Sequence, residues 1–522
     1  MDRDVIIIGS GHNGLVAAFY LAQAGLSVEV VEARGIIGGA CVTEELIPGF
    51  KFSTCANAAC WLRPKVAEDL RLVERGVQFS AMRNRVSNCY EIQTRVLPGN
   101  KPFVYWPDPD KMQAEIALHS NKDATAWPRW NSFWQQASDV IGPYLLNPPP
   151  TLSELTARAH EIGAEEVFNT VLTTSLAELA DSFFESDVMR NHVHPPMDMG
   201  SLYDVGTGLA EALSWAMGSY SETGRPAPGG YVRGGMGSIT QAMASAATEH
   251  GAVIRTQSPV KNIRVEDGSA VGVELESGES ISARIVISNA DPKRTFLKLV
   301  DTSALSSEFV SRVQGIRTNI APLKFHCALS GLPEYYAFPG SELPSIGGMI
   351  MAPDREYQES AWEDAHHGRL PRAPWMELMT PSLWDDTLAP AGKHTISFWI
   401  LFAPVHLSKG SWPERRDEMA ERLLCLIDNY SPNFRSLLLD YELLTPYDLE
   451  KRVLLTDGNI HHVDMQPGQI LWERPLPELA QYRAPVDNLY LCGAGMHPSG
   501  EVTGAPGHNA AHVILKDLDA RC

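Results

Sequence analysis

The sequence predicts an α/β protein that begins with a Rossmann-like dinucleotide-binding unit. An apolar run at residues 4–9 is typical of a strand buried on both faces, and a glycine turn follows it directly. Residues 15–24 are rich in alanine and leucine, Gly25 stands where such a helix would end, and residues 27–31 are typical of a second strand. A strand, a helix and a second strand in this order indicate a dinucleotide-binding unit.

The turn after the first strand carries the glycines that this unit needs. The first glycine allows a tight bend, the second lets the backbone approach a pyrophosphate, and the third lets the helix pack on the strand. The helix N-terminus then favours the phosphates through its free N–H groups and its dipole. A structural turn that binds no ligand is the alternative. The predicted cofactor-binding residues of this turn are Gly9, Gly11, His12, Asn13 and Gly14.

Glu32 lies 18 residues after Gly14, at the end of the second predicted strand. A carboxylate at this point can accept hydrogen bonds from the ribose hydroxyls and would repel a 2′-phosphate. The residues that follow resemble the second motif of glutathione-reductase-type flavoproteins, in which an arginine and paired glycines come after the ribose-binding acid. This resemblance implies FAD rather than NAD. It extends the predicted cofactor site to Ala33, Arg34, Gly38, Gly39 and Ala40.

Length and composition set limits on the function. The 522 residues are enough for two domains, and 44% hydrophobic with 20% charged residues is ordinary for a globular protein. A net charge of −20 argues against nucleic acid or anionic lipid as a main partner. The first strand begins too early to leave room for a signal peptide, and no run of 18 apolar residues occurs, so we expect a cytoplasmic protein.

The eight cysteines form no disulfide framework, and without CxxC pairs or a third ligand at fixed spacing we expect no metal site. Most are expected to be buried thiols. Cys55 and Cys60 have the spacing of the redox pair in flavin disulfide reductases. A predicted hairpin at residues 41–52 separates them from the paired glycines, however, and no second glycine motif offers an NAD(P)H domain. We therefore expect two structural cysteines on a helix.

The rest of the chain divides by its local pattern. Residues 89–224 are helix-rich and predict a helical cap, whose segment 166–189 has apolar residues at helical spacing. That segment could line an apolar pocket or lie on a membrane, but core packing is favoured because acidic residues accompany it. Residues 225–294 return to an α/β pattern with a helix at 239–250. Residues 295–480 suit a mixed sheet, with strands at 323–329 and 395–402 and a helix at 414–428.

The C-terminal stretch repeats the pattern of the beginning. A buried strand at 489–492 runs into Gly493, and a last helix opens near Gly504 with its N-terminus expected to point at the flavin. We therefore predict a discontinuous FAD-binding domain made of residues 1–88, 225–294 and 481–522. Residues 89–224 would form the cap and the first part of a substrate domain, and residues 295–480 its second part.

Several motifs together resemble one family over nearly the whole chain. Residues 38–45, 48–53, 62–64, 288–292, 458–462 and 489–511 are similar to the phytoene dehydrogenase and carotenoid isomerase group of FAD oxidoreductases, and within it to the pyridine nucleotide-disulfide oxidoreductase domain-containing protein 2 family. The resemblance implies a glutathione-reductase-type FAD domain, a mixed α+β substrate domain and a helical cap. It also implies that a strand near Val260 holds the adenine and that Asn289 closes the nucleotide domain.

Lys324 is the first candidate for catalysis. It lies in the apolar run 320–329, whereas a lysine is usually a solvated surface charge. Flavin amine oxidases place a lysine on a comparable strand near the flavin N5, so the resemblance implies a role there. A turn carrying Asn459, His461 and His462 is the second candidate, and His462 is preferred because the resemblance covers it.

The loop 496–504 should pass the flavin edge, since it joins the last strand to the last helix at the carboxyl end of the sheet. His497 and Glu501 lie in this loop. A buried carboxylate needs a positive partner, so Glu501 should meet Lys324, a histidine or a substrate amine; otherwise it points into solvent. Many flavoproteins of this fold carry an aspartate after the last strand, where this chain has Ala494. Backbone N–H groups are expected to replace it.

These residues predict an FAD-dependent dehydrogenase or oxidase that removes hydride from a C–C or C–N bond of a mostly apolar small molecule. Oxygen or a quinone would accept the electrons. One alternative is a redox-neutral isomerase of a polyene-like substrate, and another is a flavin-binding protein that acts through protein partners. The sequence predicts no oligomeric state.

Overall fold

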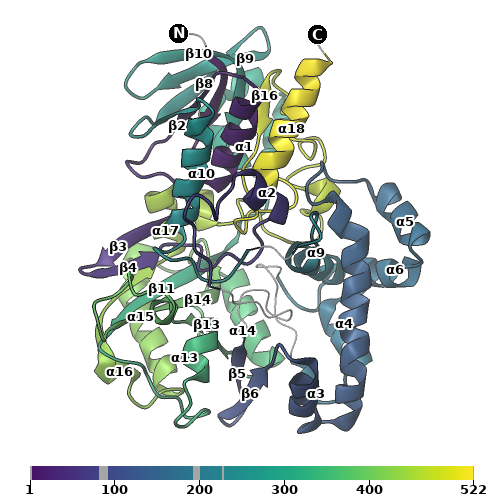
Figure 1. The fold of residues 1–522 in the computed structure, drawn as a ribbon, viewed down its shortest axis with the longest axis vertical. Coiled ribbons are helices and arrows are strands. Elements are labelled where there is room, and N and C mark those ends of the chain that lie inside the picture. The colour runs from purple at the N-terminus through teal and green to yellow at the C-terminus, as the bar shows by residue number, and fades with distance from the viewer. Residues whose placement is uncertain (1–2, 81–91, 192–199, 226–227, 521–522) are drawn as a thin grey trace.

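The first strand lies inside a seven-stranded sheet assembled from three distant parts of the chain (Figure 1). The computed structural model describes residues 3–80, 92–191, 200–225 and 228–520. The strands of this sheet follow the order β7 (Val253–Arg255), β2 (Val28–Val31), β1 (Arg3–Ile8), β10 (Ser280–Ser288), β9 (Ser269–Leu275) and β8 (Val260–Glu266), with β16 (Leu489–Leu491) also paired to β10. The expected α/β unit is confirmed.

Strand β10 changes partners along its length. Its first residues pair antiparallel with β9, and its last residues pair in parallel with β1 on one side and β16 on the other. The parallel pairing sets Ile8 opposite Ser288 and Ser288 opposite Leu491. The carboxyl ends of β1, β10 and β16 therefore meet at one edge of the sheet, where ligands of this architecture bind.

Three helices pack together beside this sheet: α1 (His12–Gln23), α10 (Gly237–Glu249) and α18 (Ala505–Asp519). Gly507 allows the close approach of α18 to α1, because a Cβ there would lie 2.1 Å from the carbonyl oxygen of Asn13. Gly25 follows α1 with φ +91°, a left-handed conformation typical of a helix end. The N-termini of α1 and α18 thus begin side by side at the carboxyl edge of the sheet.

A second seven-stranded sheet lies below the first in Figure 1. Its strand order is β15 (Leu438–Leu444), β11 (Ile320–Leu329), β14 (His394–Pro404), β13 (Trp375–Met379), β12 (Met349–Met351), β5 (Gln93–Leu97) and β6 (Lys101–Tyr105). One face packs on α15 (Trp412–Asp428), where Phe325 and Phe398 lie in the same apolar core as Leu423. The opposite face carries the polar side chains described below.

The hairpin β5–β6 belongs to this sheet, although the sequence there was expected to open a helical cap. The turn at Pro98 and Gly99 and the flanking valines are the hairpin signal that the prediction overlooked. The cap proper follows it. Its helices are α3 (Pro109–Ala117), α4 (Asn121–Ile141), α5 (Leu152–Glu161), α6 (Glu165–Thr173), α7 (Leu176–Phe183), α8 (Asp187–Arg190) and α9 (Thr207–Ser219).

The cap segment 166–189 is not one continuous helix. Ser175 accepts the N–H of Glu178 and Glu178 accepts the N–H of Ser175, so a capping box starts a new helix. Ser186 caps α8 in the same region. The apolar residues still face inward, since Val171 and Leu179 are buried in the cap core.

The hairpin β3 (Thr43–Ile47) and β4 (Phe50–Ser53) was expected, but the helix expected for the two cysteines after it is wrong. The N–H groups of Thr54 and Ala56 bond to the distant carbonyls of Val42 and Ala40, which leaves no helical ladder. Cys55 is a free, buried thiol, whereas Cys60 is disulfide-bonded. The two cysteines are therefore not bonded to each other. Cys89 and Cys522 lie outside the described residues.

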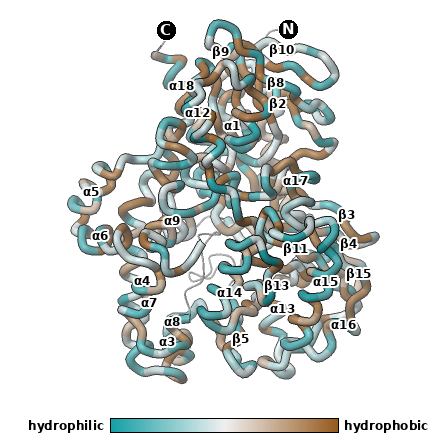
Figure 2. Tube along the Cα trace, turned by 180° about the vertical axis from the view of Figure 1, so that it is seen from behind, coloured by the Kyte–Doolittle hydropathy of each residue, from teal (hydrophilic) through white to brown (hydrophobic). Residues whose placement is uncertain are grey.

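Shorter helices complete the described chain: α2 (Pro64–Asp69), α11 (Pro292–Arg294), α12 (Ser307–Gln314), α13 (Leu343–Gly347), α14 (Arg355–His366), α16 (Phe434–Leu437) and α17 (Pro446–Val453). Within the described ranges, no helix is long and apolar enough to cross a bilayer. The 21-residue α4 illustrates this, because polar and apolar residues are mixed along it (Figure 2).

Candidate active site

The carboxyl edge of the first sheet gathers residues from four strand ends. Gly9 follows β1, Glu32 follows β2, Asn289 follows β10 and Gly493 lies just beyond β16. Asn289 Nδ2 donates to the carbonyl of Gly9 at 3.3 Å. A Cβ on Gly493 would lie 2.9 Å from the carbonyl oxygen of Asn289. Residues separated by several hundred positions in the sequence therefore form one continuous surface.

The glycine loop is tightly packed even apart from any ligand. A Cβ on Gly11 would lie 2.8 Å from Asn289 Nδ2, and a Cβ on Gly14 would lie 2.4 Å from the carbonyl oxygen of Gly9. The second contact is the helix-on-strand packing expected of the third glycine. Gly38 and Gly39 have φ values of +119° and +59°, a region that glycine occupies without strain. A Cβ on Gly39 would lie 3.2 Å from Gly11 Cα, so the two glycine motifs touch.

Glu32 lies at the end of β2, as expected, and is 6% exposed. One carboxylate oxygen accepts the N–H and the hydroxyl of Ser10 at 2.8 and 2.7 Å, and the other accepts the N–H of Arg34 at 2.8 Å. Beyond Ala33, the guanidinium of Arg34 pairs with Glu44 at 2.8 Å. Ser10 and Arg34 thereby hold the carboxylate beside the glycine loop, where a ribose hydroxyl can reach it.

The other predicted cofactor residues surround this surface. The backbone of residues 257–258 bonds to Arg34 and Glu32, and Val260 opens β8 just beyond them. Ala40 lies in the loop after the paired glycines and its carbonyl accepts the N–H of Ala56. Gly504 starts α18 in a left-handed conformation, φ +72°, and a Cβ there would lie 2.9 Å from Val66.

Buried polar atoms on this surface lack protein partners, which tests whether a cofactor fits. These atoms make no hydrogen bond with the described part of the chain: His12 Nε2, Asn13 Oδ1, His462 Nδ1, His497 Nδ1 and Ser499 Oγ. Burial lowers the pKa of His12 to about 3, and the neighbouring His462 lowers it further. Burial likewise lowers the pKa of His462 to about 4. The surface thus offers neutral donors and acceptors that demand a polar ligand, as a bound dinucleotide would be.

The turn carrying the candidate histidines is built by Asn459. Its Nδ2 donates to Asp464 at 2.7 Å and to the Ile320 carbonyl at 3.2 Å, while its Oδ1 accepts the N–H of His461 at 3.0 Å. The amide of Asn459 is therefore used inside the protein and positions the turn. His462 adopts φ +65° and directs its ring to Gly493, where an added Cβ would lie 3.0 Å from the ring.

Glu501 meets His461 rather than Lys324. The Nδ1 of His461 lies 3.1 Å from Glu501 Oε1, and the side chains are 1% and 25% exposed. A histidine was among the partners expected for this carboxylate. The sequence preferred His462 of the two neighbouring histidines, but the ion pair belongs to His461.

His497 is completely buried and joins the flavin-edge loop to the cap. Its Nε2 lies 3.0 Å from the carbonyl of Tyr144, and its own carbonyl accepts the hydroxyl of Tyr482 at 2.6 Å. Burial lowers the pKa of His497 to about 4, so the ring is neutral at physiological pH. Asn509 in α18 donates to the Tyr482 hydroxyl at 3.0 Å, which ties the loop to the last helix as well.

Arg474 fastens the two loops together and was not predicted. Its buried guanidinium donates to the carbonyls of His461 and Ala494 at 2.8 and 2.9 Å, and to Met496 at 3.3 Å. Burial lowers its pKa to about 9, and Asp464 opposes this shift. No local sequence signal marks this residue, because its partners are backbone carbonyls of segments that meet only in the fold. It is a positioning residue for both loops.

Lys324 is fully buried in the middle of β11. Its Nζ donates to Asn57, in the loop that also carries Cys55, and lies 5.1 Å from the centre of the Trp399 ring. Burial lowers the pKa of Lys324 to about 7, while Cys55 and Glu377 oppose the shift. A neutral amine is therefore available near neutral pH, on the sheet face opposite the α15 core.

Glu377 and Trp399 were missed by the sequence analysis. Trp399 pairs with Lys324 across β11 and β14, and with Glu377 across β14 and β13, so the three side chains form one row on one face. Burial raises the pKa of Glu377 to about 7. A charged residue inside an apolar strand is the signal that found Lys324, and it would also have found Glu377.

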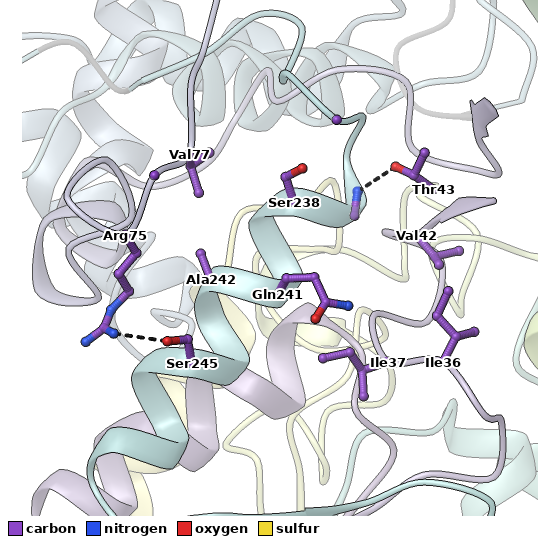
Figure 3. Close-up of a pocket in the computed structure, with 13 residues that line it drawn as sticks. Ile36, Ile37, Val42, Thr43, Arg75, Val77, Ser238, Gln241, Ala242 and Ser245 are labelled. Carbon is purple, nitrogen blue, oxygen red and sulfur yellow. Dashed lines mark hydrogen bonds between the residues drawn. The ribbon is translucent and has the colours of Figure 1, made fainter. Parts of the chain in front are cut away.

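A separate pocket of about 400 Å³ lies behind the paired glycines (Figure 3). Ser238, Gln241 and Ser245 line it from α10, and Ile36 and Ile37 form the facing wall. Its polar groups have protein partners: Ser245 accepts a hydrogen bond from Arg75 at 3.3 Å, and Thr43 accepts one from the N–H of Gly237 at 2.9 Å. This pocket therefore lacks the unpartnered polar atoms that mark the cofactor surface.

The fold and the cofactor surface together define an FAD-dependent oxidoreductase. The sequence model for flavin containing amine oxidoreductases matches residues 14–312, more than half of the chain. The protein belongs to this family.

Relatives agree with the assignment over the whole length. The chain is 35% identical to pyridine nucleotide-disulfide oxidoreductase domain-containing protein 2 of Rattus norvegicus, covering 99% of this chain and 94% of the relative. It is 24% identical to a neurosporene-forming phytoene desaturase of Cereibacter sphaeroides, covering 98% and 93%. A solved triple mutant of putrescine oxidase shares the fold, with a TM-score of 0.61, 16% identity and coverage of 100% and 99%. The resemblance stated from the motifs is confirmed.

Proposed function

We propose that this protein is a dehydrogenase or oxidase that removes hydride from a C–C or C–N bond of a mostly apolar small molecule, with Lys324 as the base. The observation that carries the proposal is the burial of Lys324 on the sheet face opposite the α15 core, next to the loop of Asn57. Bound FAD would supply the hydride acceptor, and oxygen or a quinone would reoxidise it. A relative named phytoene desaturase and a fold neighbour named putrescine oxidase keep both bond types in the proposal.

The residues of this chain supply the binding surface and the proton chemistry. The glycine loop, Glu32, Arg34 and the paired glycines would hold the adenine dinucleotide, while His12 and His462 would offer neutral hydrogen-bonding groups to it. Lys324 has a pKa of about 7, so it can accept the proton that leaves with the hydride. The apolar side chains around the row exclude water from the reacting bond.

The partners and location remain proposals of the same kind. The substrate is an apolar small molecule, and a net charge of −20 supports a protein that does not bind nucleic acid. Contact with a membrane is not part of the proposal. A cytoplasmic location and the division into the domains given above also stay predictions.

Anaerobic mixing tests the proposed function. Hexylamine and cyclohexylamine probe C–N bonds, and limonene and phytoene probe C–C bonds. Bleaching of the yellow flavin band by one of them supports dehydrogenation. Turnover only after chemical reduction of the flavin would favour the isomerase instead, and the absence of both would favour a binding protein. Lys324→Met should slow bleaching by about 100-fold, the usual size of a base effect, with FAD retained. Lys261→Met changes an exposed lysine and serves as the control.

A further inference from the structure

The sheet face that carries Lys324 is open to solvent at only two central places. Along β13 every residue is buried except Glu377, and inside β14 every residue after His394 is buried except Trp399. The neighbouring strands β11 and β12 are buried throughout. Because Glu377 and Trp399 are directly opposite each other, their partial exposure marks one accessible spot above the middle of the sheet.

Apolar groups border this spot on two sides. Trp399 packs against the cluster of Trp375 and Leu401, and also against the cluster of Ala58 and Tyr231. The accessible spot is therefore a polar point within an apolar surround. Ligand sites for small molecules have this character, since a few polar groups fix the orientation of an apolar body.

The carboxylate of Glu377 has an acceptor to spare. Gln93 Nε2 donates to its Oε1 at 2.5 Å. Within the described part of the chain, Oε2 accepts no hydrogen bond, and Glu377 has no cation within 4 Å. The next cation along the row, Arg95, directs its guanidinium to the carbonyls of Ala352 and Asn191 instead. A ligand group that donates hydrogen bonds would complete the carboxylate.

We propose that Glu377 and Trp399 form a subsite that binds the amino group of an apolar amine. A carboxylate oxygen attracts an ammonium group, and the adjacent indole face adds a cation–π contact. The subsite rests on the proposed function, because it assigns the substrate of that function to the class of apolar amines. Lys324, on the other side of Trp399, is largely neutral above pH 7 and leaves the subsite without a competing cation.

Calorimetric titration of the FAD-loaded protein tests the subsite at pH 8 without oxygen. The probes are n-hexylamine, 1-hexanol and hexanoate, which share one chain and differ in the end group. We expect hexylamine to bind at least tenfold more tightly than hexanol, and hexanoate to bind most weakly. Glu377→Gln keeps the shape and should weaken hexylamine at least tenfold while leaving hexanol within twofold. Trp399→Leu should weaken hexylamine as well. The matched control Glu442→Gln changes a partly buried carboxylate on β15 of the same sheet and should change no affinity by more than twofold.

Equal binding of the three probes by the native protein overturns the subsite, even if no variant folds. So does an unchanged hexylamine affinity in Glu377→Gln that retains FAD. Flavin bleaching is recorded separately from these affinities. Bleaching by limonene with no preference for hexylamine would leave the proposed function standing and reject the subsite alone, whereas preferential amine binding with no bleaching by any probe would reject the proposed function alone.

Discussion

His461 Nδ1 lies 3.1 Å from Glu501 Oε1, and this contact joins the histidine turn to the flavin-edge loop. Arg474 binds the carbonyls of both segments, so the ion pair is held in a fixed frame. Glu501 is only 25% exposed and adopts φ +49°, which keeps its carboxylate turned toward the histidine. The relationship makes Glu501 part of the site rather than a surface residue.

Glu501→Gln should change the pH dependence of turnover, because it removes the charge opposite His461 and preserves the shape. We expect at least a tenfold loss of kcat/KM at one end of the range from pH 5 to 9, with FAD still bound. The measurement is the pH profile of anaerobic flavin reduction by the best probe. Glu276→Gln, at an exposed position in the turn after β9, is the control. Superimposable profiles of variant and native protein would show that the ion pair has no part in the reaction.

Gly11→Val should abolish FAD binding. The Cβ would already lie 2.8 Å from Asn289 Nδ2, and the two methyl groups would extend over the surface needed by the pyrophosphate. The flavin absorbance of the purified protein measures the outcome. Gly331→Val is the matched control, since a Cβ there meets only a Leu437 methyl group at 3.5 Å. A yellow Gly11→Val protein, or recovery of NADP without flavin from the native one, contradicts the cofactor assignment.

Arg474→Lys should destabilise the protein by about 3 kcal/mol or more, because a lysine cannot supply donors to all the carbonyls that the buried guanidinium serves. The free energy of urea unfolding at pH 7 measures the effect. Arg483→Lys provides the comparison, since Arg483 pairs with Asp517 while 45% exposed, and its loss should cost less than about 1 kcal/mol. Similar losses in the two variants would argue against a positioning role for Arg474.

Stability without bound cofactor should fall steeply as the pH drops from 6.5 to 4. Burial lowers the pKa of His12 to about 3 and those of His462 and His497 to about 4, from an ordinary 6.5. In this window the unfolded chain binds more protons than the folded one, so acid favours unfolding. Each histidine contributes up to about 1.4 kcal/mol per pH unit.

His497→Gln should reduce that slope by about one histidine's share, as measured by urea unfolding of the apoprotein at four pH values between 4 and 7. His406→Gln changes a histidine that is 89% exposed and should leave the slope as it is. An unchanged slope in the His497 variant would show that its ring is protonated in the folded protein.

Local physics explains why much of the cofactor surface could be predicted. The strand, glycine turn, helix and acid of residues 4–32 are neighbours in sequence, and their spacing follows from helix and strand geometry. Lys324 could be found because an apolar strand buries whatever it carries. The expected helix at Cys55 and Cys60 was wrong, because the backbone there bonds to Val42 and Ala40 rather than to itself.

The sequence by itself determined the α/β class, the FAD motif and the strand that carries Lys324. Only the tertiary structure decided that Lys324, Trp399 and Glu377 form one row, and that Glu501 meets His461 rather than its neighbour. Cross-strand partners come from segments far apart in sequence, and their register depends on packing over the whole sheet. Arg474 shows the same limit most clearly, because carbonyl groups from separate loops form its site only after the chain has folded.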